Sequence, residues 1–155
     1  MSESTLTPSR REDLSFASID DVIVDVQHLR KGCAKAGGWN LPAMCWHLEA
    51  ATRLRMAPGP FPPNTPEQDS RAARLKDILA TGKLPSGIEA PAPALPPANV
   101  DDSAIDALIA TLKKWDAYTG PIAPHRLFGH MPEADIRKLN LIHCAHHLSY
   151  LVPTL

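Results

Sequence analysis

Apolar side chains recur at spacings of three and four residues along four stretches of the chain, a period typical of amphipathic helices. Ser18 and Asn40 directly precede the first two stretches and are residue types that cap helix N-termini. No stretch shows the alternation that predicts a β-strand. We therefore expect four long helices, which cover about 19–32, 41–56, 105–115 and 133–150.

Prolines concentrate between the second and third of these helices, at 58–63 and again at 90–97, with a short helical pattern at 66–80. Such tracts are typical of stiff, extended surface connections. A chain of 155 residues has room for one hydrophobic core. The predicted fold class is all-α, a four-helix bundle with a long proline-rich crossover between helices 2 and 3. Residues 1–14 are predicted to form a flexible arm, and 15–155 the domain.

Charge and composition exclude several classes of partner. The chain has 16 Lys and Arg against 17 Asp and Glu, and no basic run that could follow a phosphate backbone, so we expect no nucleic-acid partner. Its apolar stretches are shorter than the ~20 residues that cross a bilayer, so we expect no membrane partner either. The odd count of 3 cysteines and the polar N-terminus predict a reducing, cytoplasmic location.

Three histidines fall at inward positions of the predicted helices. His143 and His147 are one helical turn apart and differ by only about 40° in direction, so they share a face. His47 lies on the apolar stripe of the second helix. Three imidazoles can hold one divalent ion with an open fourth position. The alternative is that each is a core histidine with its own hydrogen-bond partner, and spacing alone leaves both interpretations open.

Other ring-bearing residues are candidates for the surroundings or the entrance of such a site. His146 points about 100° away from His147 and is not expected to be a ligand. His125 and His130 flank a predicted turn and could line an entrance, whereas Trp39 is expected to wall the core. Tyr150 falls on the same face of the last predicted helix as the histidine pair.

These motifs resemble the DinB-like (DinB/YfiT-like) superfamily of metal-binding four-helix bundles. Its ligand positions match His47 in WHLEA and His143 and His147 in HCAHH. Over about residues 15–151 the chain resembles one bacterial branch of this superfamily, whose domain has no known function. The resemblance lies in the order of three segments: GGWNLPAMCWHLEAA, a proline-rich middle and LFGHMPEADIRKLNLIHCAHHLSYL. Arg126 is a departure, because that branch often has proline there, and it puts the shape of the entrance in doubt.

The resemblance implies a divalent metal ion, zinc or nickel, and a homodimer. It also implies a small-molecule substrate, because relatives include transferases that join a low-molecular-weight thiol such as bacillithiol, mycothiol or glutathione to an electrophile. A metal with an open position would deprotonate such a thiol, but it could equally activate water for hydrolysis. A non-catalytic, stress-related metal-binding module is a third possibility, and the sequence does not separate the three.

Overall fold

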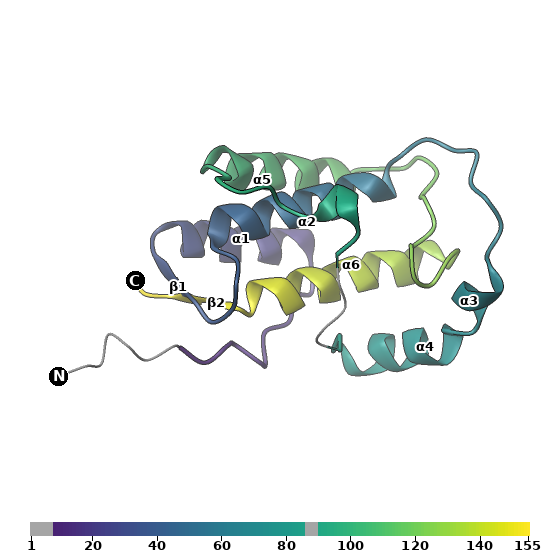
Figure 1. Cartoon of the computed structure of the whole chain (residues 1–155), viewed down its shortest axis with the longest axis horizontal. Coiled ribbons are helices and arrows are strands. Elements are labelled where there is room, and N and C mark those ends of the chain that lie inside the picture. Colours follow the sequence, from purple (N-terminus) through teal and green to yellow (C-terminus); the bar gives the residue numbers. More distant parts are fainter. Residues whose placement is uncertain (1–7, 86–89) are drawn as a thin grey trace.

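The computed structural model describes residues 8–85 and 90–155 and is mostly helical (Figure 1). Within these residues it has six α-helices, a two-stranded antiparallel sheet and a single-turn 3-10 helix, η2. The elements are α1 (Ile19–Arg30), β1 (Cys33–Lys35), α2 (Leu41–Arg55), α3 (Pro66–Asp69), α4 (Ala72–Thr81), η2 (Ala92–Ala94), α5 (Ser103–Asp116), α6 (Glu133–Leu148) and β2 (Leu151–Pro153).

The first two long helices begin at the residues that the sequence pattern indicates. The Ser18 side chain accepts a hydrogen bond from the backbone N–H of Asp21 at 3.2 Å. Asn40 does the same for the N–H of Ala43 at 3.1 Å, and Pro42 lies in the first turn, where its missing N–H leaves no gap in the helix. Both predicted caps are confirmed, and the apolar residues of α2 are buried together with His47, which is 2% exposed.

The core lies between the four long helices. α2 packs most extensively against α5, while α1 contacts α5 and α6. α6 also contacts α2 on one side and α4 on the other, as Figure 1 shows. Trp115 and the leucines and valines of this core are almost fully buried, as are Cys45 and Cys144, which pack as small apolar side chains.

The small sheet is a feature that the sequence pattern did not predict. β1 and β2 pair antiparallel, with Cys33 opposite Pro153 and Lys35 opposite Leu151. Each strand has only 3 residues, too few for an alternating pattern to be recognised. The pairing joins the end of the chain to the segment between α1 and α2, and α6 ends before it, at Leu148.

The proline-rich crossover contains more structure than an extended surface connection. The single helical segment predicted at 66–80 is two helices, α3 and α4, and Thr65 begins the first with a capping box to Gln68. η2 lies within the second proline tract and packs on α2, where Ala94 is only 1% exposed. Part of the crossover therefore belongs to the packed interior.

The predicted N-terminal arm lies partly outside the described residues, which begin at residue 8. Arg11 pairs with both carboxylate oxygens of Asp25 on α1, at 2.7 and 3.0 Å. Its guanidinium also donates to the carbonyls of Leu148 and Leu151 at the end of α6 and the start of β2. In the part of the chain that the structure describes, no helix has the length and apolar character needed to span a membrane.

Candidate metal centre

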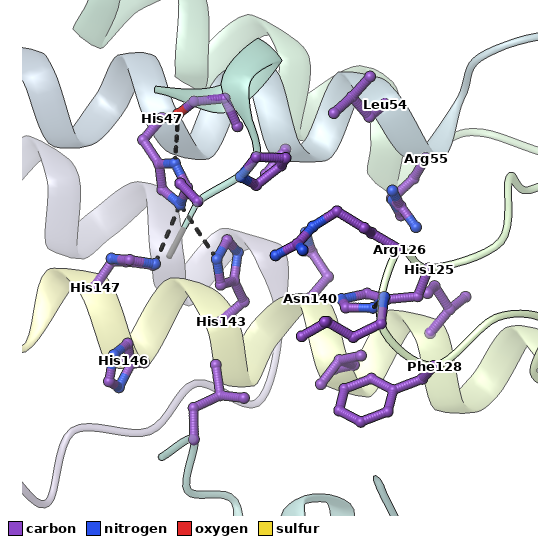
Figure 2. A pocket seen from close by; sticks show the side chains of 18 of the residues that line it. His47, Leu54, Arg55, His125, Arg126, Phe128, Asn140, His143, His146 and His147 are labelled. Carbon is purple, nitrogen blue, oxygen red and sulfur yellow. Dashed lines mark hydrogen bonds between the residues drawn. The ribbon is translucent and has the colours of Figure 1, made fainter. Parts of the chain in front are cut away.

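The structure brings His47, His143 and His147 together across the interface of α2 and α6 (Figure 2). The Nε2 atom of His47 lies 3.3 Å from Nε2 of His143 and 3.1 Å from Nε2 of His147. The potential ligand atoms of all three lie within 4.8 Å of one another. Residues separated by nearly a hundred positions thus form one cluster of imidazole nitrogens.

The spacing of these nitrogens fits a tetrahedral metal ion. Two ligand atoms on such an ion, with bonds of ~2.0–2.1 Å, lie roughly 3.3–3.4 Å apart. The two separations from His47, 3.3 and 3.1 Å, are close to that value. The three side chains could therefore hold one ion, whose identity this geometry leaves open.

A hydrogen bond from the crossover fixes the protonation of His47. Its Nδ1 lies 2.7 Å from the carbonyl oxygen of Ala94 in η2. A carbonyl only accepts, so Nδ1 carries the proton and the lone pair of Nε2 faces the other two rings. Such an outer hydrogen bond is the usual way in which a ligand histidine is oriented.

Burial keeps the three imidazoles neutral. Desolvation lowers the pKa of His47, against the raising effect of the Ala94 carbonyl. It also lowers the pKa of His143 well below its ordinary value, with the neighbouring histidines adding to the effect. For His147, burial together with His47 and His146 lowers the pKa to about 2. Neutral imidazole is the form that binds a metal, so the cluster needs no deprotonation near neutral pH.

Trp39 and His146 flank the cluster. The Trp39 ring lies 5.0 Å from the ring of His47 and 5.9 Å from that of His147, centre to centre, and so walls one side. His146 lies 5.1 Å from the His147 ring but accepts, through Nδ1, from the guanidinium of Arg10 at 3.5 Å. His146 is thus a neighbour of the cluster and not part of it.

A cavity of about 170 Å³ extends from the three histidines between α2, α6 and the loop before α6. An engineered protein cavity of about 150 Å³ admits benzene, so this one has room for a molecule of that size beside the cluster. Its walls are mainly apolar and include Leu54, Ile136 and Leu139.

Polar groups gather in the cavity beyond the histidine cluster, as Figure 2 shows. Arg55, at the end of α2, donates to the carbonyls of Pro124 at 2.8 Å and Ala123 at 3.4 Å. His125 accepts through Nδ1 from the N–H of Leu127 at 3.0 Å, which leaves its proton on Nε2. Burial, with Arg55 and Arg126 adding to it, lowers the pKa of His125 to about 3.

Two of the candidate residues lie elsewhere. His130 is exposed, and its Nε2–H donates to the carbonyl of Pro62 at 2.8 Å. Tyr150 was expected on the face of the last helix, but α6 ends at Leu148, and the Tyr150 ring lies under the Arg10 guanidinium at 4.2 Å. Neither residue lines the cavity, whereas His125, His146 and Trp39 do.

Arg55 and Asn140 are cavity residues that sequence reasoning missed. Asn140 lies on α6, three residues before His143 and seven before His147, so it shares their face. Arg55 lies eight residues after His47 on α2, two turns along the same side. Both residues could therefore have been found from the sequence, as polar residues at helical spacing from the proposed metal ligands.

Comparison with known proteins gives a family but no characterised relative. No curated protein and no solved structure matches the chain. A family described as "Protein of unknown function (DUF1569)" matches residues 8–154, which include all three clustered histidines. The chain therefore belongs to the DUF1569 family.

Proposed function

We propose that the protein is a metal-dependent enzyme in which His47, His143 and His147 bind one divalent ion, zinc or nickel. The observation that carries this proposal is the meeting of three neutral imidazoles, one buried and two half-buried, with both separations from His47 close to those of a tetrahedral ion and the tautomer of His47 fixed by Ala94. Nε2 of His47 lies within hydrogen-bonding distance of Nε2 of both other histidines. A shared cation would replace these contacts with a bond to each of the three nitrogens.

The proposed reaction is transfer of a low-molecular-weight thiol to a small electrophile. A metal with three neutral ligands and an open position supplies a Lewis acid that lowers the pKa of a bound thiol. The sulfur then forms a bond to the electrophilic carbon, the leaving group departs with the bonding electrons, and the thiol proton passes to solvent. The chain contributes the ligands, the Trp39 wall and a cavity of about 170 Å³ in which the electrophile lies beside the sulfur.

Hydrolysis by metal-bound water is the alternative reaction at the same site. Zinc hydrolases that carry their histidines on one helix commonly use a glutamate as general base. Among the described residues that line this cavity, none is Asp or Glu. Glu49, two positions from His47, instead pairs with Arg53 and accepts from the Thr111 hydroxyl. A thiol that a bound metal ionised would need no general base, whereas hydrolysis would need one from outside these residues.

We also infer that the DUF1569 family is a branch of the DinB-like superfamily. The support is the packing of α1, α2, α5 and α6 around one core, the arrangement of a four-helix bundle, with one histidine from α2 and the pair from α6. A homodimer and a cytoplasmic location, where such thiols are abundant and reduced, complete the proposal.

The test is an activity assay on protein loaded with zinc or nickel. Glutathione, bacillithiol and mycothiol are each supplied with a chromogenic electrophile such as 1-chloro-2,4-dinitrobenzene. We expect turnover that needs both metal and thiol, that His143→Ala abolishes, and that His130→Ala, outside the cavity, leaves unchanged. Release of chloride without any thiol would refute thiol transfer and favour the hydrolase.

A further inference from the structure

A tight hairpin in the loop before α6 holds His125 in the cavity wall. The backbones of His125 and Gly129 pair in both directions, with N–H to carbonyl distances of 2.9 and 2.8 Å. Gly129 has a φ of 73°, a left-handed conformation that favours glycine. Within the hairpin, the N–H of Leu127 donates to Nδ1 of His125 at 3.0 Å, which fixes the ring relative to its own backbone.

Side chains of the crossover hold the same hairpin from outside. Gln68, in α3, donates through Nε2 to the carbonyls of His125 at 3.4 Å and Arg126 at 3.1 Å. Arg71, directly before α4, donates to the carbonyl of Leu127 at 3.0 Å. The position of His125 is therefore set by hydrogen bonds from both within and outside the loop.

The Nε2–H of His125 is a hydrogen-bond donor that is open to the cavity. Because Nδ1 accepts from Leu127, the ring proton is on Nε2, and no group in residues 8–85 and 90–155 accepts from it. Among the described residues, the only side-chain N or O atom that is buried without a partner is Oδ1 of Asn140, so Nε2 is not closed off. His125 lines the cavity, and it lies near enough to His143 for a charge on it to lower the pKa of His143.

Asn140 gives a second, independent indication of a polar ligand in this cavity. It lines the cavity, is 8% exposed, and its Nδ2 lies 3.3 Å from the Thr52 hydroxyl. In either orientation of the amide, one end pairs with Thr52 and the other has no partner among the described residues. Figure 2 shows Asn140 and His125 on the side of His143 that faces away from His147. A ligand atom that meets such unpaired groups gains affinity, because leaving them unpaired is unfavourable.

A neutral donor beside apolar walls narrows the class of electrophile. Leu54, Ile136 and Leu139 line the cavity and would contact an apolar body. Burial lowers the pKa of His125 to about 3, so near neutral pH its ring donates as a neutral imidazole. A fixed donor contributes most where negative charge develops on an oxygen during the reaction. An epoxide with an apolar substituent meets both conditions, because its oxygen takes up negative charge when sulfur attacks the adjacent carbon.

We propose that His125 is a catalytic residue whose Nε2–H donates a hydrogen bond to the oxygen of such an epoxide. The inference rests on the proposed function, because it names the electrophile of the thiol transfer. The sulfur forms a bond to an epoxide carbon, the bond from that carbon to oxygen breaks, and its electron pair goes to the oxygen. The oxygen then takes a proton from solvent, which balances the proton that the thiol releases to solvent. His125 keeps its own proton throughout.

Heteronuclear NMR of metal-free wild-type protein, labelled on histidine, tests the hydrogen bond without any reaction. Acetophenone supplies an oxygen acceptor on an apolar body, and ethylbenzene has a similar size without the acceptor. We expect the Nε2–H proton of His125 to move downfield with acetophenone and not with ethylbenzene, and acetophenone to bind about tenfold more tightly. No movement with acetophenone, or the same movement with both, would overturn the proposal.

Turnover by zinc-loaded protein tests the catalytic role, with styrene oxide and benzyl chloride as electrophiles for the three thiols named above. His125→Phe keeps an aromatic ring but loses the donor, so it should lower kcat for styrene oxide by roughly 10²-fold and affect benzyl chloride little. His125→Gln, which keeps a side-chain N–H, should recover part of the loss. Gln68→Leu is the control, because it loosens the hold on the hairpin but keeps the imidazole, and it should affect both electrophiles equally.

The outcomes separate this inference from the proposed function. Turnover of benzyl chloride without turnover of styrene oxide would support thiol transfer and overturn the epoxide. Equal losses for both electrophiles in His125→Phe, or none for styrene oxide, would overturn the catalytic role of His125. Turnover of neither electrophile by the wild type would refute the proposed function and that role together. The NMR result on the metal-free wild type decides the hydrogen bond in every case, including one in which His125→Phe does not fold.

Discussion

Acidification should destabilise the metal-free protein because its cavity histidines stay neutral in the folded state. The pKa of His125 is lowered to about 3 and that of His147 to about 2. In the unfolded chain each takes up a proton below about pH 6.5, so acid favours unfolding. The free energy of unfolding is thus expected to fall as the pH drops below 6.5. The contribution of His125 to this fall ends near pH 3 and that of His147 near pH 2.

The size of the effect follows from these values. Between pH 7.5 and 5 each of the two histidines lowers the free energy of unfolding by about 2 kcal/mol, or about 4 kcal/mol together. His47, His143 and His146, whose pKa values are also lowered by burial, act in the same direction. Such a loss is a large part of the ~5–15 kcal/mol that stabilises a typical domain.

Urea denaturation at half-unit pH steps, with metal removed by a chelator, measures this loss. His125→Gln should reduce it by about 2 kcal/mol, because glutamine takes up no proton. Val24→Ala, an exposed substitution on α1 that changes no titratable group, is the control and should keep the wild-type pH dependence. A free energy of unfolding that is constant or rises between pH 7.5 and 5 would refute the neutral buried cluster.

Two substitutions test the groups that hold the cavity in shape. Ala94→Leu should overpack the buried contact of η2 with α2 and lower the free energy of unfolding, measured by heat or urea, by about 1–3 kcal/mol. Because His47 would lose its carbonyl partner, the same substitution should weaken metal binding ~10–100-fold in a chelator competition. Leu95→Ala, at the exposed neighbouring residue, should have neither effect. Thr52→Val should lower the free energy of unfolding in urea by about 1–3 kcal/mol, because it leaves the Asn140 amide without its hydroxyl partner. Adding Asn140→Leu to this variant should recover part of the lost stability. If the costs of the two substitutions simply add, the pairing of Thr52 with Asn140 is contradicted.

The elements with long, regular patterns were predictable from sequence. Ser18 and Asn40 mark helix starts because their side-chain oxygens satisfy backbone N–H groups in the first turn, a purely local effect. The meeting of the three histidines was predictable for a similar reason. One turn separates His143 from His147, and His47 occupies the apolar stripe of its own helix.

Features that depend on distant partners were not predictable in this way. The strands owe their existence to pairing between Cys33–Lys35 and Leu151–Pro153, and that pairing also explains why α6 ends before Tyr150. The carbonyl that orients His47 comes from Ala94, in a proline tract that looks like a plain connection. Arg55 and His125 meet only because the loop before α6 folds back on the end of α2.

Metal analysis of the purified protein tests the central claim most directly. The wild type is loaded with zinc or nickel, desalted and analysed by atomic spectroscopy beside His47→Ala and His143→Ala, with His146→Gln as the control from the same helix. We predict one ion per chain in the wild type and the control, and little in either alanine variant. A wild type without metal, or metal that persists in both alanine variants, would contradict the three-histidine site.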